Sequence, residues 1–165
     1  MKLRKLIEPP EGQEKPSRPP ESGPRKRADY MASLLHWAEL CGAEISPDAR
    51  EFMKSDTSLA LRAALVAKDE GRFHDFHGPM YRARWAQPRD PADPGVVHSL
   101  LKDAGLDADA ALARAESEEL VTRLERDTKE AIERGVFGVP TIFVDDKMFW
   151  GNDRFELVRH FLTMD

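Results

Sequence analysis

The stretch that decides the fold lies near the C-terminus, where residues 133–155 read ERGVFGVPTIFVDDKMFWGNDRF. Two short runs rich in β-branched and aromatic residues, 139–144 and 147–150, are separated by a pair of aspartates. This pattern is typical of a β-hairpin. An amphipathic helix is predicted to follow over residues 153–161. The sequence therefore predicts that the chain ends in a hairpin and a helix.

Pro140 stands directly before the first predicted strand. A proline removes one donor from the strand ladder, which the start of a regular strand tolerates, and it also suits a cis peptide bond in a tight turn. If the bond between Val139 and Pro140 is cis, the amide and carbonyl of Val139 point out of the sheet. They are then free to pair with an extended peptide ligand. A trans proline that merely starts a strand remains the alternative.

Residues 151–154, Gly-Asn-Asp-Arg, place a helix N-terminus just after the second strand. Free backbone amides at such an end attract a carboxylate, and the side chain of Asp153 can accept from an ammonium group. Together these groups suit an amino-acid zwitterion. The alternative is that Asp153 and Glu156 form an ordinary capping box with no ligand.

Two segments of this stretch, GVFGVPTIFV and FWGNDRF, resemble the C-terminal signature of a known family. It is the family of 2-hydroxychromene-2-carboxylate isomerases and kappa-class glutathione transferases, within the DsbA-like thioredoxin superfamily. The resemblance is specific over residues 128–162 and weaker over residues 27–105. It implies an α/β, thioredoxin-like fold that is interrupted by a large all-helical lobe, with glutathione bound between the two parts.

The resemblance also implies roles for particular residues. Val139 would pair its backbone with the cysteinyl part of glutathione, and Pro140 would be the cis residue. Asn152 and Asp153 would hold the γ-glutamyl end. Trp85 and Trp150 resemble aromatic residues of the family's substrate cleft, although core anchors are the simpler interpretation of Trp37, Trp85 and Trp150.

The N-terminal part departs from the family pattern. Members of the family begin with a strand, a Ser-Pro turn whose serine faces the glutathione sulfur, and a helix, and this sequence has none of these. We therefore expect a fold that is incomplete at its N-terminus, and we assign no catalytic residue. A late start in the gene model and a degenerate relative are both consistent with this pattern. Residues 2–7 are predicted to form a short remnant strand.

The chain is predicted to have three parts. Residues 1–24 form a proline-rich linker or arm, because their composition buries too little apolar surface to offset the entropy of ordering. Residues 25–135 form the helical lobe and a connecting helix. Residues 136–165 form the cis-proline hairpin and the terminal helix of the thioredoxin-like part.

Start and stop signals of helices recur along the predicted lobe. Its first helix is predicted over residues 28–41, and the pair Gly78 and Pro79 is expected to kink or split a helix over residues 73–85. The other signals are capping residues at predicted helix starts and glycines at predicted helix ends: Ser46, Asp56, Asp93, Asp107 and Ser117; Gly42, Gly71, Gly105 and Gly135.

Composition excludes several classes of function. The formal net charge of the 165 residues is -5, and Arg25, Lys26 and Arg27 form a lone tight basic run, so general nucleic-acid binding is not expected. No window of the sequence resembles a membrane-spanning helix or a secretory signal, so we expect a cytoplasmic protein.

The presence of a single cysteine excludes several kinds of cysteine site within one chain. Cys41 has no partner for an internal disulfide, a two-cysteine redox motif or a thiolate zinc cluster. It is interpreted as a small core residue, with a reactive thiol as the alternative. His74 and His77 are the nearest approach to a metal motif, but a site needs three or four converging ligands. No metal is expected.

These observations lead to a first hypothesis and two alternatives. The first is a glutathione-dependent isomerase or transferase that acts on an aromatic or conjugated small molecule without net redox change. The alternative is a non-catalytic binding or assembly module that keeps the peptide-accepting edge, and a thiol-disulfide oxidoreductase is a distant third. Because a partial sheet exposes a strand edge, we expect a homo-oligomer.

Overall fold

A computed structural model of the chain describes residues 24–163. The predicted strand over residues 2–7 and almost all of the predicted arm lie outside the described residues. The chain divides into two compact units, residues 1–124 and residues 125–165. Among the described residues, no helix is long and apolar enough to cross a membrane.

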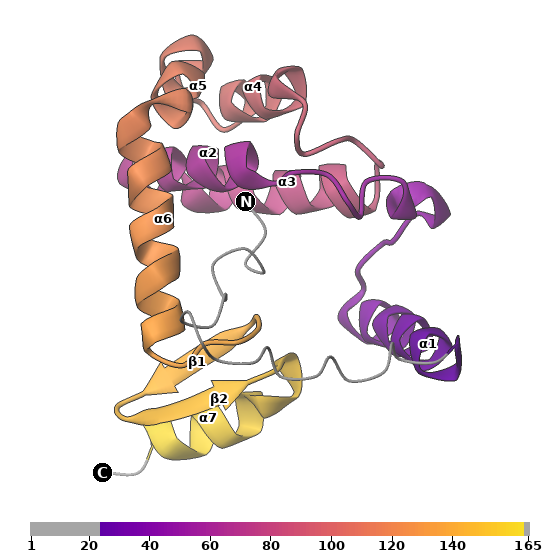
Figure 1. Ribbon diagram of the computed structural model, residues 1–165. Coiled ribbons are helices and arrows are strands. Elements are labelled where there is room, and N and C mark those ends of the chain that lie inside the picture. The colour runs from indigo at the N-terminus through magenta and orange to yellow at the C-terminus, as the bar shows by residue number, and fades with distance from the viewer. Residues whose placement is uncertain (1–23, 164–165) are drawn as a thin grey trace, which may run out of the picture. The chain divides into compact units, whose positions relative to one another are not determined.

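The first unit is helical and carries most of the core. Its elements are α1 (Pro24–Cys41), the 3-10 turn η2 (Pro47–Arg50), α2 (Ser58–Asp69), α3 (Phe73–Trp85), α4 (Pro94–Asp103) and α5 (Ala108–Glu116). Figure 1 shows α2 beside α3, with α4 and α5 stacked on the same pair. These four helices bury a cluster whose largest fully buried side chains include Val66, Phe76, Val97 and Leu101.

Most helix boundaries lie where the capping residues predicted them. The carboxylate of Asp93 accepts from the amide of Gly95 at 2.7 Å, and that of Asp107 accepts from the amide of Ala110 at 3.1 Å. The side chain of Ser46 accepts from the amide of Asp48, and Asp56 accepts from Ser58, at the starts of the next elements. Each contact satisfies an amide that the first turn leaves without an intrahelical partner, so these local predictions are confirmed.

Other sequence-based predictions of the helical unit are wrong. Helix α1 begins at Pro24 and not at residue 28, because proline suits the first helical position. The element after Ser46 is a 3-10 turn. Helix α3 is not split, since it runs from Phe73 to Trp85 with Pro79 inside it.

The expected core roles of Cys41 and of two tryptophans are also wrong. Cys41 is exposed at the end of α1. The exposed fractions of Trp37 and Trp150 are 37% and 50%, whereas Trp85 is half-buried. Apolar spacing along one helix does not reveal whether another element covers that face.

A charged network joins three helices of the first unit. The carboxylate of Asp69 on α2 accepts from Arg114 on α5 at 2.6 Å and from Arg123 at 2.7 Å. Arg123 belongs to α6 (Glu118–Glu133), which extends across the division between the units. The hydrogen bond from Arg123, followed by its charge and by Arg114, holds the pKa of Asp69 below its ordinary value, although burial opposes this effect.

The free energy of unfolding is therefore expected to depend on Asp69 in acid. Because its pKa is lower in the folded state, the stabilisation is present at neutral pH and is lost as the pH falls below about 4 toward the folded-state pKa. Asp69→Asn is expected to lower the free energy of unfolding at pH 7 by about 1 kcal/mol and to flatten its decline in acid. Urea titrations at several pH values measure both effects. Asp103→Asn, at an exposed aspartate of α4, is the control, and equal pH profiles of the two variants would contradict the assignment.

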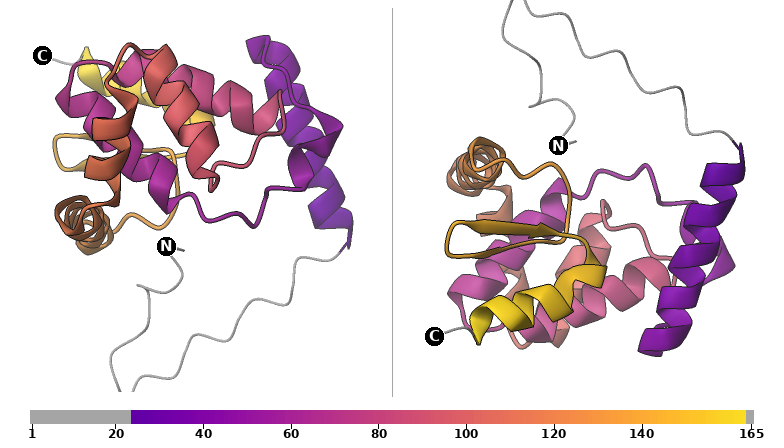
Figure 2. Two further views of the ribbon diagram at one scale, coloured as in Figure 1. Left: turned by 90° about the horizontal axis from the view of Figure 1, so that it is seen from above. Right: turned by 90° about the horizontal axis from the view of Figure 1, so that it is seen from below.

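The second unit contains the end of α6, a hairpin and a terminal helix. Strand β1 (Thr141–Val144) pairs antiparallel with β2 (Lys147–Trp150), so the predicted hairpin is confirmed. The 3-10 turn η3 (Asn152–Arg154) leads into α7 (Phe155–Leu162). Helix α7 lies against one face of the hairpin (Figure 2), where the rings of Phe149 and Phe161 are 5.5 Å apart.

Candidate functional site

The end of α6 sets the direction of the segment that carries the candidate site. Gly135 has φ +88°, its amide donates to the carbonyl of Ile132, and the amide of Val136 donates to the carbonyl of Ala131. This pair of bonds is a Schellman motif, which stops a helix through a left-handed residue. The chain consequently leaves α6 and enters the hairpin within a few residues.

The open end of the hairpin brings the two predicted parts of the site together. Thr141 lies opposite Trp150 in the strand register, and the amide of Gly151 donates to the carbonyl of Pro140 at 3.0 Å. The Val139–Pro140 peptide bond is cis. Residues 139 and 140 therefore lie beside the start of η3, although they are separated from it by the whole hairpin.

The main chain of Val139 has no hydrogen-bond partner among the described residues. The residue is 80% exposed, and its amide and carbonyl take part in no hydrogen bond within the part of the chain that the structure describes. The residues on either side of the Val139–Pro140 pair are joined by a hydrogen bond, in which the side chain of Thr141 donates to the carbonyl of Gly138 at 2.6 Å. An amide and a carbonyl that are held in place without partners offer two hydrogen bonds to an extended peptide.

Asn152 and Asp153 form the turn next to this main chain, and both are exposed. The capping alternative for Asp153 is not realised, because neither η3 nor α7 has a side-chain hydrogen bond at its N-cap. Among the described residues, Arg154 forms an ion pair with this carboxylate, with Nη1 at 3.6 Å from Oδ2. The Asp153 side chain therefore does not cap a helix.

A cavity of about 350 Å³ lies next to Val139. Residues from the end of α6 and from β1 line it, among them Asp127, Glu130, Arg134, Thr141 and Phe143. The guanidinium carbon of Arg134 lies 3.8 Å from the centroid of the Phe143 ring, a cation–π contact that fixes the position of the positive charge. Sequence reasoning missed Arg134, because the contact joins a helix end to a strand and leaves no periodic signal.

An aromatic pair borders the site on the side of β2. The rings of Phe137 and Trp150 lie 4.9 Å apart, and both residues are more than 45% exposed. A Cβ at Gly138 would stand 2.5 Å from Nε1 of Trp150, so the chain approaches the indole closely there. Sequence reasoning identified Trp150 but not its partner Phe137.

The histidines that were considered as metal ligands have ring contacts. The His77 ring lies 4.8 Å from that of Phe73 and 4.7 Å from that of Tyr81, and His74 also contacts Phe73. Over residues 24–163, no group of three or more His, Cys, Asp or Glu side chains is arranged to hold a metal ion.

Comparisons with known proteins show which proteins this chain resembles. The model of the DSBA-like thioredoxin domain family matches residues 6–163. A 2-hydroxychromene-2-carboxylate isomerase of Sphingobium xenophagum is 34% identical over 132 residues, which are 80% of this chain and 66% of that protein. A Pseudomonas putida protein of the same name is 36% identical over 78% of this chain and 62% of its own length.

A solved structure agrees with the sequence comparisons. The structure of a selenomethionine 2-hydroxychromene-2-carboxylate isomerase superposes with a TM-score of 0.70 and 26% identity over 84% of this chain and 66% of its own. The chain thus spans roughly two thirds or less of the length of the relatives that it matches. The resemblance that the C-terminal segments indicated is confirmed, and so is the DsbA-like fold. The chain belongs to the DSBA-like thioredoxin domain family.

Proposed function

We propose that this chain is a glutathione-dependent isomerase acting on an aromatic or conjugated small molecule. Two kinds of observation support the proposal. The relatives named above are isomerases of 2-hydroxychromene-2-carboxylate. Val139 is an exposed residue whose main chain is unpaired among the described residues, as a site for an extended peptide requires. The unpaired main chain of the exposed residue Val139 carries the glutathione assignment.

The charges around Val139 fit glutathione, which has one ammonium group and two carboxylates. Asp153, beside Asn152, offers a carboxylate to the ammonium of the γ-glutamyl end. Arg134, in the cavity next to Val139, offers a guanidinium to a carboxylate. The amide and carbonyl of Val139 serve the peptide groups between these ends. The chain therefore carries a complementary group for the ammonium, for the peptide groups and for one of the two carboxylates.

The residues of the site have a binding and orienting role in this proposal. When bound, glutathione supplies a thiol that adds to a conjugated electrophile and leaves again, so that the isomerisation involves no net redox change. Val139 fixes the extended backbone, and Asp153 and Arg134 fix its two ends. No residue of the chain is assigned as the acid or base.

Titration of the full chain with glutathione tests the binding site. Asp153→Ala is expected to weaken glutathione binding by about 1–3 kcal/mol, because a charged hydrogen-bond partner of the ammonium is lost. Isothermal titration calorimetry measures the effect. The control is Asp146→Ala, at an exposed aspartate in the turn at the far end of the hairpin, which should leave the affinity unchanged.

A shorter ligand sharpens this test. N-acetyl-Cys-Gly lacks the γ-glutamyl group and its ammonium, so its affinity should be the same for the wild-type chain and for Asp153→Ala. If Asp153→Ala weakened both ligands equally, the carboxylate would act through the fold and not through the ammonium. An unchanged glutathione affinity would remove Asp153 from the site.

Turnover tests the reaction itself. The absorbance of 2-hydroxychromene-2-carboxylate is followed with the full chain in the presence and absence of glutathione. Isomerisation that depends on both supports the enzyme. Binding of glutathione without isomerisation would favour the second candidate below.

The second candidate is a non-catalytic binding or assembly module. It is favoured by one observation: Phe137, Trp150 and Phe155 expose apolar area next to a sheet that has two strands among the described residues. Such edges and patches tend to pair with another chain. The mass in solution, measured by light scattering, discriminates, because a stable oligomer without glutathione affinity supports the module. A homo-oligomer and a cytoplasmic location remain predictions under both candidates.

A further inference from the structure

The outer edge of β1 carries main-chain groups that the hairpin does not use. The amide of Gly151 donates to the carbonyl of Pro140, and this pair fixes which residues of β1 face β2. Because hydrogen-bonded and non-hydrogen-bonded pairs alternate along an antiparallel ladder, Thr141 and Phe143 turn their amides and carbonyls away from β2. No backbone hydrogen bond from elsewhere in residues 24–163 reaches these groups. Among the described residues, the edge of β1 is therefore open to a further strand.

Pro140 does not interrupt this open edge. It belongs to the pair that faces β2, so its missing N–H is a donor that the outer edge does not need. The main chain of Val139 is also unpaired, and Val139, Thr141 and Phe143 line the same cavity. These three residues together offer three donors and three acceptors.

The edge of β1 lacks the features that usually prevent edge-to-edge pairing. Exposed strand edges are commonly protected by charged side chains, above all by lysine. Strand β2 carries Lys147, whereas residues 136–144, VFGVPTIFV, contain no charged residue. An uncharged edge with free main-chain groups favours the addition of a strand from another chain.

A second copy of this chain is a suitable partner because the edge is complementary to itself. Antiparallel pairing about a twofold axis places Thr141 opposite Thr141 of the second copy, and Val139 opposite Phe143 on both sides of the axis. All three residues present free main-chain groups, so this register makes six hydrogen bonds. Thr–Thr pairs and pairs of an aromatic with a β-branched residue are favourable across strands.

Charges near the two ends of the edge also fit this arrangement. Arg134 lies over the Phe143 ring, and Asp153 lies in the exposed turn beside Val139, where Arg154 is 3.6 Å from it. An antiparallel pair therefore brings the Arg134 end of one edge to the Asp153 end of the other, twice. The cavity beside the edge holds two carboxylates as well as Arg134, so the two copies do not meet as surfaces of a single sign.

We infer that the open edge of β1 pairs with a second copy of this chain, antiparallel and centred on Thr141, and that glutathione competes with this copy for Val139. The pairing stands on the strand alone, and the competition rests on the proposed function. A twofold contact uses the same edge of both chains, so it closes at a dimer. An interface of one short strand is small, and the dimer is expected to be weak.

Sedimentation of the full chain between about 10 μM and 1 mM tests the pairing, since weak dimers dissociate in this range. A phosphine reductant is present, because exposed Cys41 could otherwise join two chains by a disulfide. The wild-type chain is expected to show a reversible equilibrium between monomer and dimer. Thr141→Lys and Thr141→Glu should each raise the dimer dissociation constant about fivefold or more, because two like charges then face each other across the axis.

An equimolar mixture of Thr141→Lys and Thr141→Glu is the decisive sample. Opposite charges now meet at the axis, so the dissociation constant of the mixed dimer should return to within about twofold of the wild-type value. Both variants lose the hydrogen bond from Thr141 to Gly138, and this loss cannot explain a recovery on mixing. The recovery requires that residue 141 lies opposite itself.

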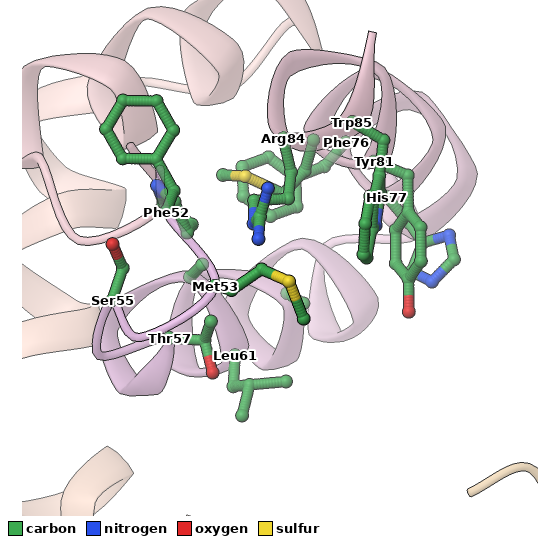
Figure 3. A pocket seen from close by; sticks show the side chains of 14 residues that line it. Phe52, Met53, Ser55, Thr57, Leu61, Phe76, His77, Tyr81, Arg84 and Trp85 are labelled. Carbon is green, nitrogen blue, oxygen red and sulfur yellow. The ribbon is translucent and has the colours of Figure 1, made fainter. Parts of the chain in front are cut away.

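Two pairs of control variants carry the same charges elsewhere. Met148→Lys and Met148→Glu lie on β2, away from the proposed interface. Tyr81→Lys and Tyr81→Glu lie in the helical unit, where exposed Tyr81 borders a pocket of about 460 Å³ (Figure 3). Neither pair should change the dimer dissociation constant, singly or mixed. Circular dichroism verifies that every variant is folded.

Sedimentation with glutathione tests the competition. Glutathione at ten times its own dissociation constant should raise the apparent dimer dissociation constant roughly a hundredfold, because both chains must release their ligand before they pair. A dimer that persists unchanged while glutathione is bound would contradict the competition.

Four results would overturn the pairing. They are a wild-type chain that stays monomeric up to 1 mM, as it would if its own residues 2–7 covered the edge; a dimer that neither Thr141 variant weakens; a mixture no better than its components; and a dimer weakened by the Met148 variants instead. A dimer without glutathione affinity supports the pairing and contradicts the proposed function. Glutathione binding by a chain that stays monomeric contradicts only the inference.

Discussion

Gly151→Ala is expected to lower the affinity for glutathione by about a hundredfold or more. Gly151 has φ +111° and ψ 152°, a region that is essentially restricted to glycine. A Cβ there would also lie 2.5 Å from Oδ1 of Asp153. The backbone must therefore leave this conformation, and Asn152 and Asp153 move away from Val139. Isothermal titration with glutathione measures the loss.

Gly42→Ala is the matched control for this variant. Gly42 also has a positive φ, +64°, but it lies after α1, and a Cβ would meet nothing within 4 Å. The substitution is expected to cost about 1 kcal/mol of stability and to leave glutathione affinity unchanged. If Gly151→Ala bound glutathione as the wild-type chain does, the turn at residues 151–153 would have no part in the site.

Leu101→Ala is expected to lower the free energy of unfolding by about 2–5 kcal/mol. Leu101 on α4 is fully buried in the cluster that α2, α3 and α5 also form. Its truncation removes apolar contacts and leaves a cavity that neighbouring helices fill only in part. Because a domain has only about 5–15 kcal/mol of stability in total, the unfolding midpoint in urea should fall clearly.

The control for the core variant is Leu40→Ala. Leu40 on α1 is 76% exposed, so the same truncation should change the stability by about 0.5 kcal/mol or less. Similar losses in the two variants would mean that the four-helix cluster does not dominate the stability of the helical unit. Far-ultraviolet circular dichroism during urea titration measures both.

Local features of the fold were predictable because they depend on residues close in sequence. Asp93 and Asp107 cap helices through amides two or three residues further on, and Gly135 ends α6 through its own positive φ. The two runs flanking the paired aspartates give the hairpin. The resemblance carried by the same stretch predicted the DsbA-like fold, which the family model confirms.

Burial and helix continuity were less predictable, because neighbours distant in sequence decide them. Cys41 and Trp37 have the spacing of core residues on α1, yet both are exposed. Pro79 stands where an isolated helix would be expected to break, but α3 is continuous and contributes Phe76 and Met80 to the core. Packing of an apolar face stabilises a helix more than propensity does, and tertiary contacts can therefore override a local breaker.

Most of the helices, their caps, the hairpin and the family could be inferred from the sequence, because each depends on a short stretch or on a recognisable motif. Three contacts between elements could not be inferred from it: the carbonyl of Pro140 pairs with Gly151, Arg134 lies over Phe143, and Arg84 of α3 lines the same apolar pocket as alanines of α2. Those arrangements join residues through packing between elements. Such packing depends on side-chain volumes and on the coverage of faces, which no local pattern specifies.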